Sequence, residues 1–209
     1  MTDIPTAQDE EHWGTCLHEA GHLWASHQLL GDRRAASSVR AGAHRAVGQW
    51  TPTNGNTIGD PSQPPLRLVG HPLDGMDPAE RQRADRWLVM LLIGDEAETL
   101  SIRPPSGGWA RPTVPAPPPA LPADIDAVLV AAESRSTVGL EQTDGGQARK
   151  LAVELVGPVT AGAYIAWATL EARQAVCTHS APIHALASAL WREPIIDGQT
   201  AAAILERSS

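Results

Sequence analysis

The sequence predicts a mainly α-helical (α+β) domain that includes a small β-hairpin or edge-strand element. Several long segments place apolar residues at helical spacing between helix-capping residues, whereas only one short segment alternates as strands do. The chain has 209 residues, of which 42% are apolar and 19% are charged, a balance typical of globular proteins. This length suits one domain, and we predict a single domain over residues 1–209.

The first half of the chain contains two predicted helices with a hairpin between them. The first helix covers about residues 9–30, with acidic residues in its first turn and Gly31 as a natural stop. Residues 37–52 alternate loosely and predict a short β-hairpin. The second helix covers about residues 77–100, because an Asp cap is followed by Pro78, which suits the first helical position.

The second half of the chain is interrupted by segments rich in Pro and Gly. Residues 53–77 predict a loop, and residues 103–122 form a Pro-rich excursion. We expect Gly145-Gly146 to break the chain and Gly157-Pro158 to kink a long helix. Further helices are predicted over residues 123–136, 148–176, 182–191 and 198–206.

Charge and hydropathy restrict the cellular role of the protein. The formal net charge of −8 argues against binding to nucleic acid, which needs a basic surface. The longest apolar run, residues 87–93, is far too short to cross a bilayer, and the N-terminus lacks an apolar signal segment. The two cysteines, Cys16 and Cys177, suggest no disulfide framework. We therefore predict a cytoplasmic protein without membrane or nucleic-acid partners.

The strongest chemical signal is the segment His18-Glu19-Ala20-Gly21-His22 in the first predicted helix. Residues four apart share one face of a helix, so the imidazoles of His18 and His22 can reach one Zn²⁺ at roughly 2.0–2.1 Å. Zinc lowers the pKa of a bound water towards about 7, and Glu19 can take the proton and return it to a leaving amine. The motif predicts a zinc metallopeptidase whose catalytic residue is Glu19.

A catalytic zinc ion needs a third protein ligand, which spacing alone leaves open. One candidate is Glu98, in the second predicted helix. The others are Asp124 and Asp126, which follow the Pro-rich excursion.

Three segments resemble the peptidase domain of FtsH-type zinc proteases, which are membrane AAA+ enzymes that degrade proteins. Residues 15–22 fit the HEAGH helix of that family. Residues 91–100 are similar to its Leu-Gly-Gly-x-Ala-Ala-Glu-x-Leu stretch, and residues 124–128 resemble its Asn-Asp-Leu-x-x-Ala helix start. The resemblance implies a zincin-like helical peptidase fold. It also implies that Asp124 is the third zinc ligand. Glu98 would then have a structural role next to the ligands without binding the ion itself.

The chain also departs from that family in ways that shape the predicted function. It contains no G-x-x-x-x-G-K-[ST] loop, and no transmembrane helix precedes the motif, so ATP-driven unfolding and a membrane location are not implied. We therefore predict an ATP-independent metalloendopeptidase that hydrolyses flexible peptides or unfolded protein tails. Residues 47–51 resemble the family's edge strand and can bind such a substrate by strand addition.

The sequence leaves two other functions open. One is a non-catalytic, zinc-binding regulatory or interaction protein derived from the peptidase fold, although such a module would not need Glu19. The other is a zinc hydrolase that acts on a small molecule, for which a closed cavity rather than an open groove is expected. The sequence also leaves open whether the protein forms a homo-oligomer or works with a separate partner protein.

Overall fold

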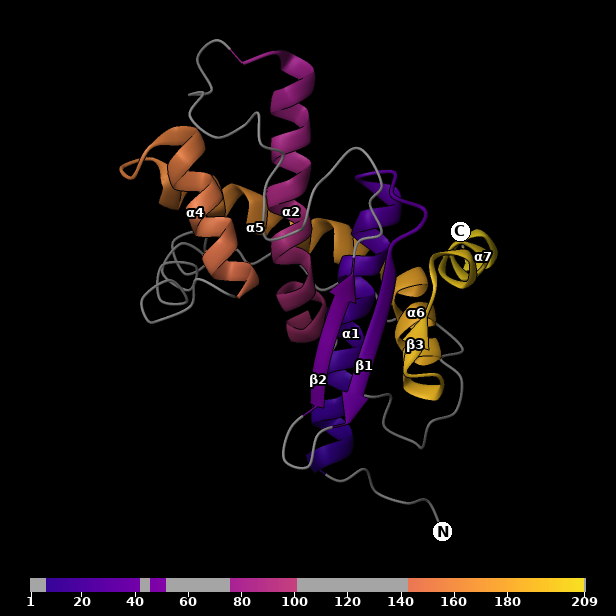
Figure 1. Cartoon of the computed structure of the whole chain (residues 1–209). Helices are drawn as coiled ribbons and strands as arrows, with labels where there is room; N and C mark the ends of the chain where they lie inside the picture. The colour runs from indigo at the N-terminus through magenta and orange to yellow at the C-terminus, as the bar shows by residue number, and fades with distance from the viewer. Residues whose placement is uncertain (1–6, 42–45, 52–75, 101–142, 209) are drawn as a thin grey trace.

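The computed structural model describes residues 7–41, 46–51, 76–100 and 143–208 (Figure 1). These residues form long helices and one small antiparallel sheet, which confirms the predicted mainly α class with a small β element. In chain order the elements are α1 (Ala7–Gln28), β1 (Ala36–Ala41), β2 (Ala46–Thr51), α2 (Pro78–Leu100), α4 (Asp144–Val156), α5 (Ala161–Thr178), α6 (Ser180–Arg192), β3 (Ile195–Ile196) and α7 (Gly198–Ser208).

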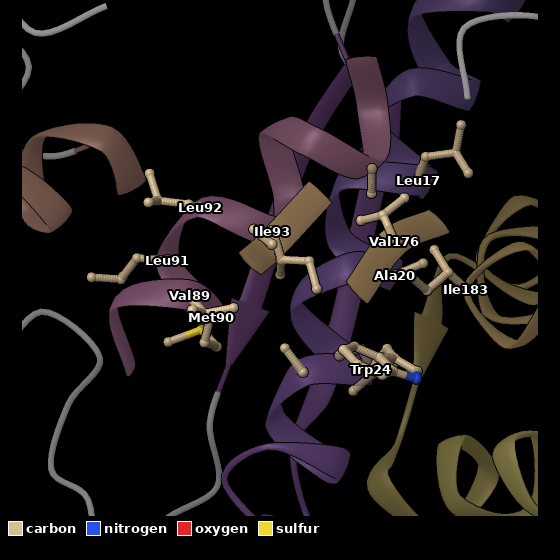
Figure 2. Close-up of a cluster of buried hydrophobic side chains, with 14 of the residues drawn as sticks. Leu17, Ala20, Trp24, Val89, Met90, Leu91, Leu92, Ile93, Val176 and Ile183 are labelled. Carbon is tan, nitrogen blue, oxygen red and sulfur yellow. The ribbon is translucent and has the colours of Figure 1, made fainter. Parts of the chain in front are cut away.

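Helices α1 and α2 pack against each other, and Figure 2 shows buried apolar side chains from both helices in one cluster. The apolar run of α2 is buried on every side, because α1, α4 and α5 all contact this helix. The large side chains of Leu17, Trp87 and Ile93 are at most 1% exposed. None of the described helices combines the length and apolarity needed to cross a lipid bilayer.

The predicted hairpin is present, and it is part of a three-stranded sheet. β1 pairs antiparallel with β2, with Ala36 opposite Thr51 and Ala41 opposite Ala46. The two-residue strand β3, which the sequence did not predict, pairs with the other edge of β1, so the strand order is β2-β1-β3. The hairpin lies against α1, with β2 on the side of α2 and α4 (Figure 1).

Local capping signals explain where the first two helices begin and end. The side chain of Asp77 accepts a hydrogen bond from the backbone N–H of Ala79 at 2.8 Å, which fixes the start of α2 as predicted. Gly31 has a φ of 71°, a left-handed conformation that suits glycine and stops the chain from continuing α1.

Two sequence predictions in the second half are wrong. Gly145 and Gly146 do not break the chain but lie in the first turn of α4, where the Thr143 hydroxyl accepts a hydrogen bond from the Gly146 N–H at 3.2 Å. The expected kinked helix over residues 148–176 is two helices, because Gly157 has a φ of 78° and ends α4. The Pro-rich excursion, the helix predicted over residues 123–136 and nearly all of the 53–77 loop lie outside the described residues.

Candidate metal centre

The two histidines of the HEAGH segment meet on the face of α1 that contacts α2. His18 and His22 lie one helical turn apart, and their ring centroids are 4.7 Å from each other. Their Nε2 atoms are 3.1 Å apart, so both point to the same small volume. The His22 side chain is 2% exposed and that of His18 is 20% exposed, which leaves the site open to solvent on the His18 side.

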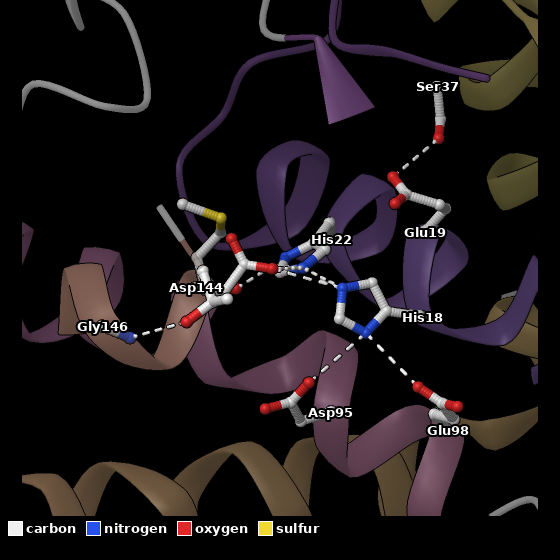
Figure 3. Close-up of polar contacts among 10 residues, drawn as sticks. His18, Glu19, His22, Ser37, Asp95, Glu98, Asp144 and Gly146 are labelled. Atoms are coloured by element: carbon white, nitrogen blue, oxygen red, sulfur yellow. Dashed lines mark hydrogen bonds and ion pairs between the residues drawn. The ribbon is translucent and has the colours of Figure 1, made fainter. Parts of the chain in front are cut away.

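A carboxylate from a distant part of the chain completes this cluster (Figure 3). Asp144 is the first residue of α4, 122 residues after His22. Its Oδ2 atom lies 3.2 Å from His18 Nε2 and 3.1 Å from His22 Nε2. These three groups can hold a metal ion, and they are the only such group of three or more among the described residues.

The spacing of the three atoms suits a tetrahedral ion. Three ligands at 2.0–2.1 Å from one tetrahedral ion lie about 3.3 Å from each other. The observed separations are 3.1–3.2 Å. Two imidazoles and one carboxylate are also a donor set that suits zinc and related transition metals better than Ca²⁺ or Mg²⁺, which prefer oxygen ligands alone.

The neighbours of each imidazole leave its Nε2 available for a metal. His22 Nδ1 lies 2.9 Å from the carbonyl oxygen of Met90, and since a carbonyl only accepts, Nδ1 donates and neutral His22 has its lone pair on Nε2. His18 Nδ1 lies 3.5 Å from Asp95 Oδ1 and 3.7 Å from Glu98 Oε2. Both carboxylates favour a proton on Nδ1 and therefore a lone pair on His18 Nε2.

The absence of a side chain at Gly94 creates the space beside these nitrogen atoms. A Cβ atom built at Gly94 would lie 2.4 Å from His22 Nε2 and 2.9 Å from His18 Nε2. Gly21 lies at the same helix crossing, where a Cβ atom would come within 3.0 Å of the carbonyl oxygen of Ile93. The two glycines therefore let α1 and α2 approach closely and keep the volume in front of both imidazoles free.

Charge interactions within the cluster shift the pKa values of Asp144 and His22 in opposite directions. Burial on its own raises the pKa of Asp144, but the neighbouring His22 and His18 outweigh burial and hold this pKa far below its usual value. Burial likewise disfavours the charged form of His22, but Asp144 outweighs it and raises the His22 pKa to about 9. Three electron-rich atoms this close together need a cation between them, either a proton or a metal ion.

Glu19 lies between this cluster and the sheet. Its side chain is 5% exposed, and its Oε2 atom accepts a hydrogen bond from the Ser37 hydroxyl of β1 at 3.3 Å. Figure 3 shows the carboxylate beside His18 and directed towards Ser37. Burial raises the pKa of Glu19, and the nearby His22 and His18 oppose that rise. A buried carboxylate of this kind is suited to taking up and releasing a proton.

The structure brings together some of the residues expected from the sequence. His18 and His22 share one cluster, with Glu19 beside it. Asp124 and Asp126, the expected carboxylate ligands, lie outside the described residues. Glu98 approaches Nδ1 of His18 rather than the Nε2 atom that faces the cluster, so it is not placed as a ligand.

Sequence reasoning missed Asp144, although a signal for it was present. Ala148 follows Asp144 by four residues, which is the spacing of Asp and Ala in the Asn-Asp-Leu-x-x-Ala pattern. Thr143 is a good helix cap, and the later buried positions of α4 have helical spacing. Gly145-Gly146 obscured this signal, because a pair of glycines usually indicates a turn. The buried positions are Ala148, Leu151, Ala152 and Leu155.

Comparison of the chain with known protein families gives no match, and comparison with curated proteins gives none either. The functional interpretation therefore depends on the geometry and chemistry of the cluster itself.

Proposed function

We propose that this protein is a zinc-dependent, ATP-independent metallopeptidase with a zincin-like, FtsH-type fold. His18, His22 and Asp144 would hold the zinc ion, and Glu19 would act as general base and general acid. The observation that supports this most directly is the convergence of three metal-binding atoms to 3.1–3.2 Å next to the glutamate of an HExxH helix. Asp144 takes the part that the sequence had suggested for Asp124.

Each residue of the cluster has a distinct part in peptide hydrolysis. When bound, zinc supplies a Lewis acid that acidifies water and polarises the carbonyl group of the substrate. Met90 orients His22, and Asp95 with Glu98 orients His18. The carboxylate of Glu19 accepts a proton from the attacking water and then donates it to the nitrogen of the leaving amine.

The sheet offers a place for an extended substrate. β1 is paired on both sides, whereas β2 has no second partner among the described strands. Since β2 lies on the side of β1 nearer α2 and α4 (Figure 1), a peptide added to its free edge would run on the side of the metal cluster. Strand addition requires an extended backbone, so we propose flexible peptides and unfolded protein tails as substrates.

A non-catalytic zinc-binding regulatory protein is the second candidate. One observation favours it: Asp144 joins the start of α4 to α1 across 122 residues of sequence, so a bound ion would tie distant helices together. In this case the protein would bind zinc without hydrolysing peptides.

Metal analysis and a Glu19→Gln variant test the proposal. Purified protein should bind about one zinc per chain. Glu19→Gln should keep the zinc and lose hydrolysis of unstructured fluorogenic peptides by about 10²–10⁴-fold, because the proton acceptor is removed while the ligands stay intact. Glu171→Gln, an equivalent change at an exposed position of α5, is the matched control and should leave activity unchanged.

The possible results separate the two candidates. Full hydrolysis by Glu19→Gln would contradict the catalytic mechanism. Stoichiometric zinc without hydrolysis by the wild-type protein would favour the regulatory protein over the peptidase.

A further inference from the structure

Ser37 is the residue through which the sheet contacts the proposed catalytic carboxylate. Its side chain is 2% exposed, and its hydroxyl lies 3.3 Å from Glu19 Oε2. Within the described part of the chain, Ser37 is the only hydrogen-bond partner of the Glu19 side chain. Because a carboxylate only accepts when ionised, the Ser37 hydroxyl donates in this bond.

The backbone of Ser37 is held from both sides. It lies opposite Trp50 of β2 and opposite Ile196 of β3. Only Ser37 and its neighbour Ser38 pair with both outer strands in the described sheet. The hydroxyl that reaches Glu19 therefore comes from the most constrained section of the sheet.

We propose that Ser37 is a positioning residue for Glu19, an inference that rests on the proposed peptidase function. A hydroxyl that donates to an ionised carboxylate makes a charge-assisted bond, which is stronger than a neutral one. This bond engages Oε2 and leaves Oε1 as the oxygen that exchanges the proton. Ser37 pairs with Trp50 of β2, the strand at which we place the substrate. The position of the Glu19 side chain therefore depends on the position of β2.

Removing the hydroxyl group tests this role. In Ser37→Ala, we expect kcat to fall by about tenfold or more, as is typical when a hydrogen bond that orients a functional group is lost. KM and zinc affinity should stay unchanged, because the variant leaves β2 and the three ligands intact. The ¹³C signal of the Glu19 side-chain carboxyl, assigned with Glu19→Gln, should also shift, and this readout does not depend on turnover.

The chain offers a matched control for this change. Ser26 on α1 is fully buried, and its hydroxyl has no hydrogen-bond partner among the described residues, so Ser26→Ala removes the same atom at another buried position. We expect Ser26→Ala to keep wild-type kcat and the wild-type carboxyl signal. If Ser37→Ala does not fold, Ser37→Cys preserves the side-chain shape with a weak donor and carries the same prediction.

Two kinds of failure can be told apart. If the Ser37 variant kept wild-type kcat and an unshifted Glu19 signal, the positioning role would be overturned and the proposed function would stand. An equal loss of kcat in Ser26→Ala would have the same consequence. A wild-type protein that binds zinc but hydrolyses no peptide would overturn the proposed function, and the catalytic role of Ser37 with it.

Discussion

The two halves of the candidate metal centre are built in different ways. The half from α1 and α2 belongs to the buried core: His22 is 2% exposed, and Gly21 and Gly94 let the two helices approach closely. The other half is a single carboxylate, Asp144, which is 34% exposed and comes from the first turn of α4. Helix packing therefore prepares the imidazoles, whereas the approach of a distant helix end completes the site.

The largest effect should come from filling the space that helix packing leaves open. In Gly94→Ala, the new methyl group would lie 2.4 Å from His22 Nε2, so the imidazole must move away from its partner ligands. We expect zinc affinity, measured by competition with a chelator, to fall by more than about 100-fold, because loss of a mere orienting contact already costs about 10–100-fold.

A second glycine provides the control for that variant. A Cβ atom at Gly145, in the first turn of α4, would meet no atom of the described residues within 4 Å. Gly145→Ala should keep wild-type zinc affinity, and far-UV circular dichroism should show helical protein for both variants. Tight zinc binding by Gly94→Ala would show that α1 and α2 do not hold the imidazoles as described.

The next effect concerns the half supplied by α4. Asp144→Asn keeps the shape of the side chain but removes the charge that faces both imidazoles, so we expect zinc affinity to fall by about 100-fold or more. Asp124→Asn, which changes the aspartate suggested by the sequence, should bind zinc as the wild type does. If Asp124→Asn lost zinc affinity and Asp144→Asn kept it, the third ligand would be Asp124 instead of Asp144.

The smallest effect is expected from a residue that orients a ligand without binding the ion. Asp95 lies 3.5 Å from His18 Nδ1, closer than Glu98 at 3.7 Å, and both carboxylates can accept the same proton. Because Glu98 remains, Asp95→Asn should lower zinc affinity by only about tenfold, measured by the same chelator competition. A loss as large as that of Asp144→Asn would place Asp95 among the ligands.

The contrast between the two halves also explains what could be predicted from the sequence. The meeting of His18 and His22 could be predicted because helical spacing alone places the two imidazoles on one face, and Glu19 follows His18 in the same segment. The hairpin and the ends of α1 and α2 followed from equally local signals, such as Asp77 and Gly31. Local chemistry was therefore sufficient to predict half of the candidate site and most of the described elements.

The remaining features depend on contacts between segments that are distant in sequence. Asp144 meets His22 across 122 residues, and its helix start was obscured by two glycines. Gly94 matters only because α1 crosses α2 at that point, and the hydroxyl of Ser37 matters only because β1 lies against α1. No periodicity or capping rule contains that information.

Crystallographic anomalous diffraction at the zinc absorption edge tests the central claim most directly. On zinc-loaded protein, we expect one strong peak at about 2.0–2.1 Å from Nε2 of His18, Nε2 of His22 and a carboxylate oxygen of Asp144. A peak whose third protein ligand is a residue other than Asp144, or zinc-soaked crystals without a peak at the two imidazoles, would contradict the account.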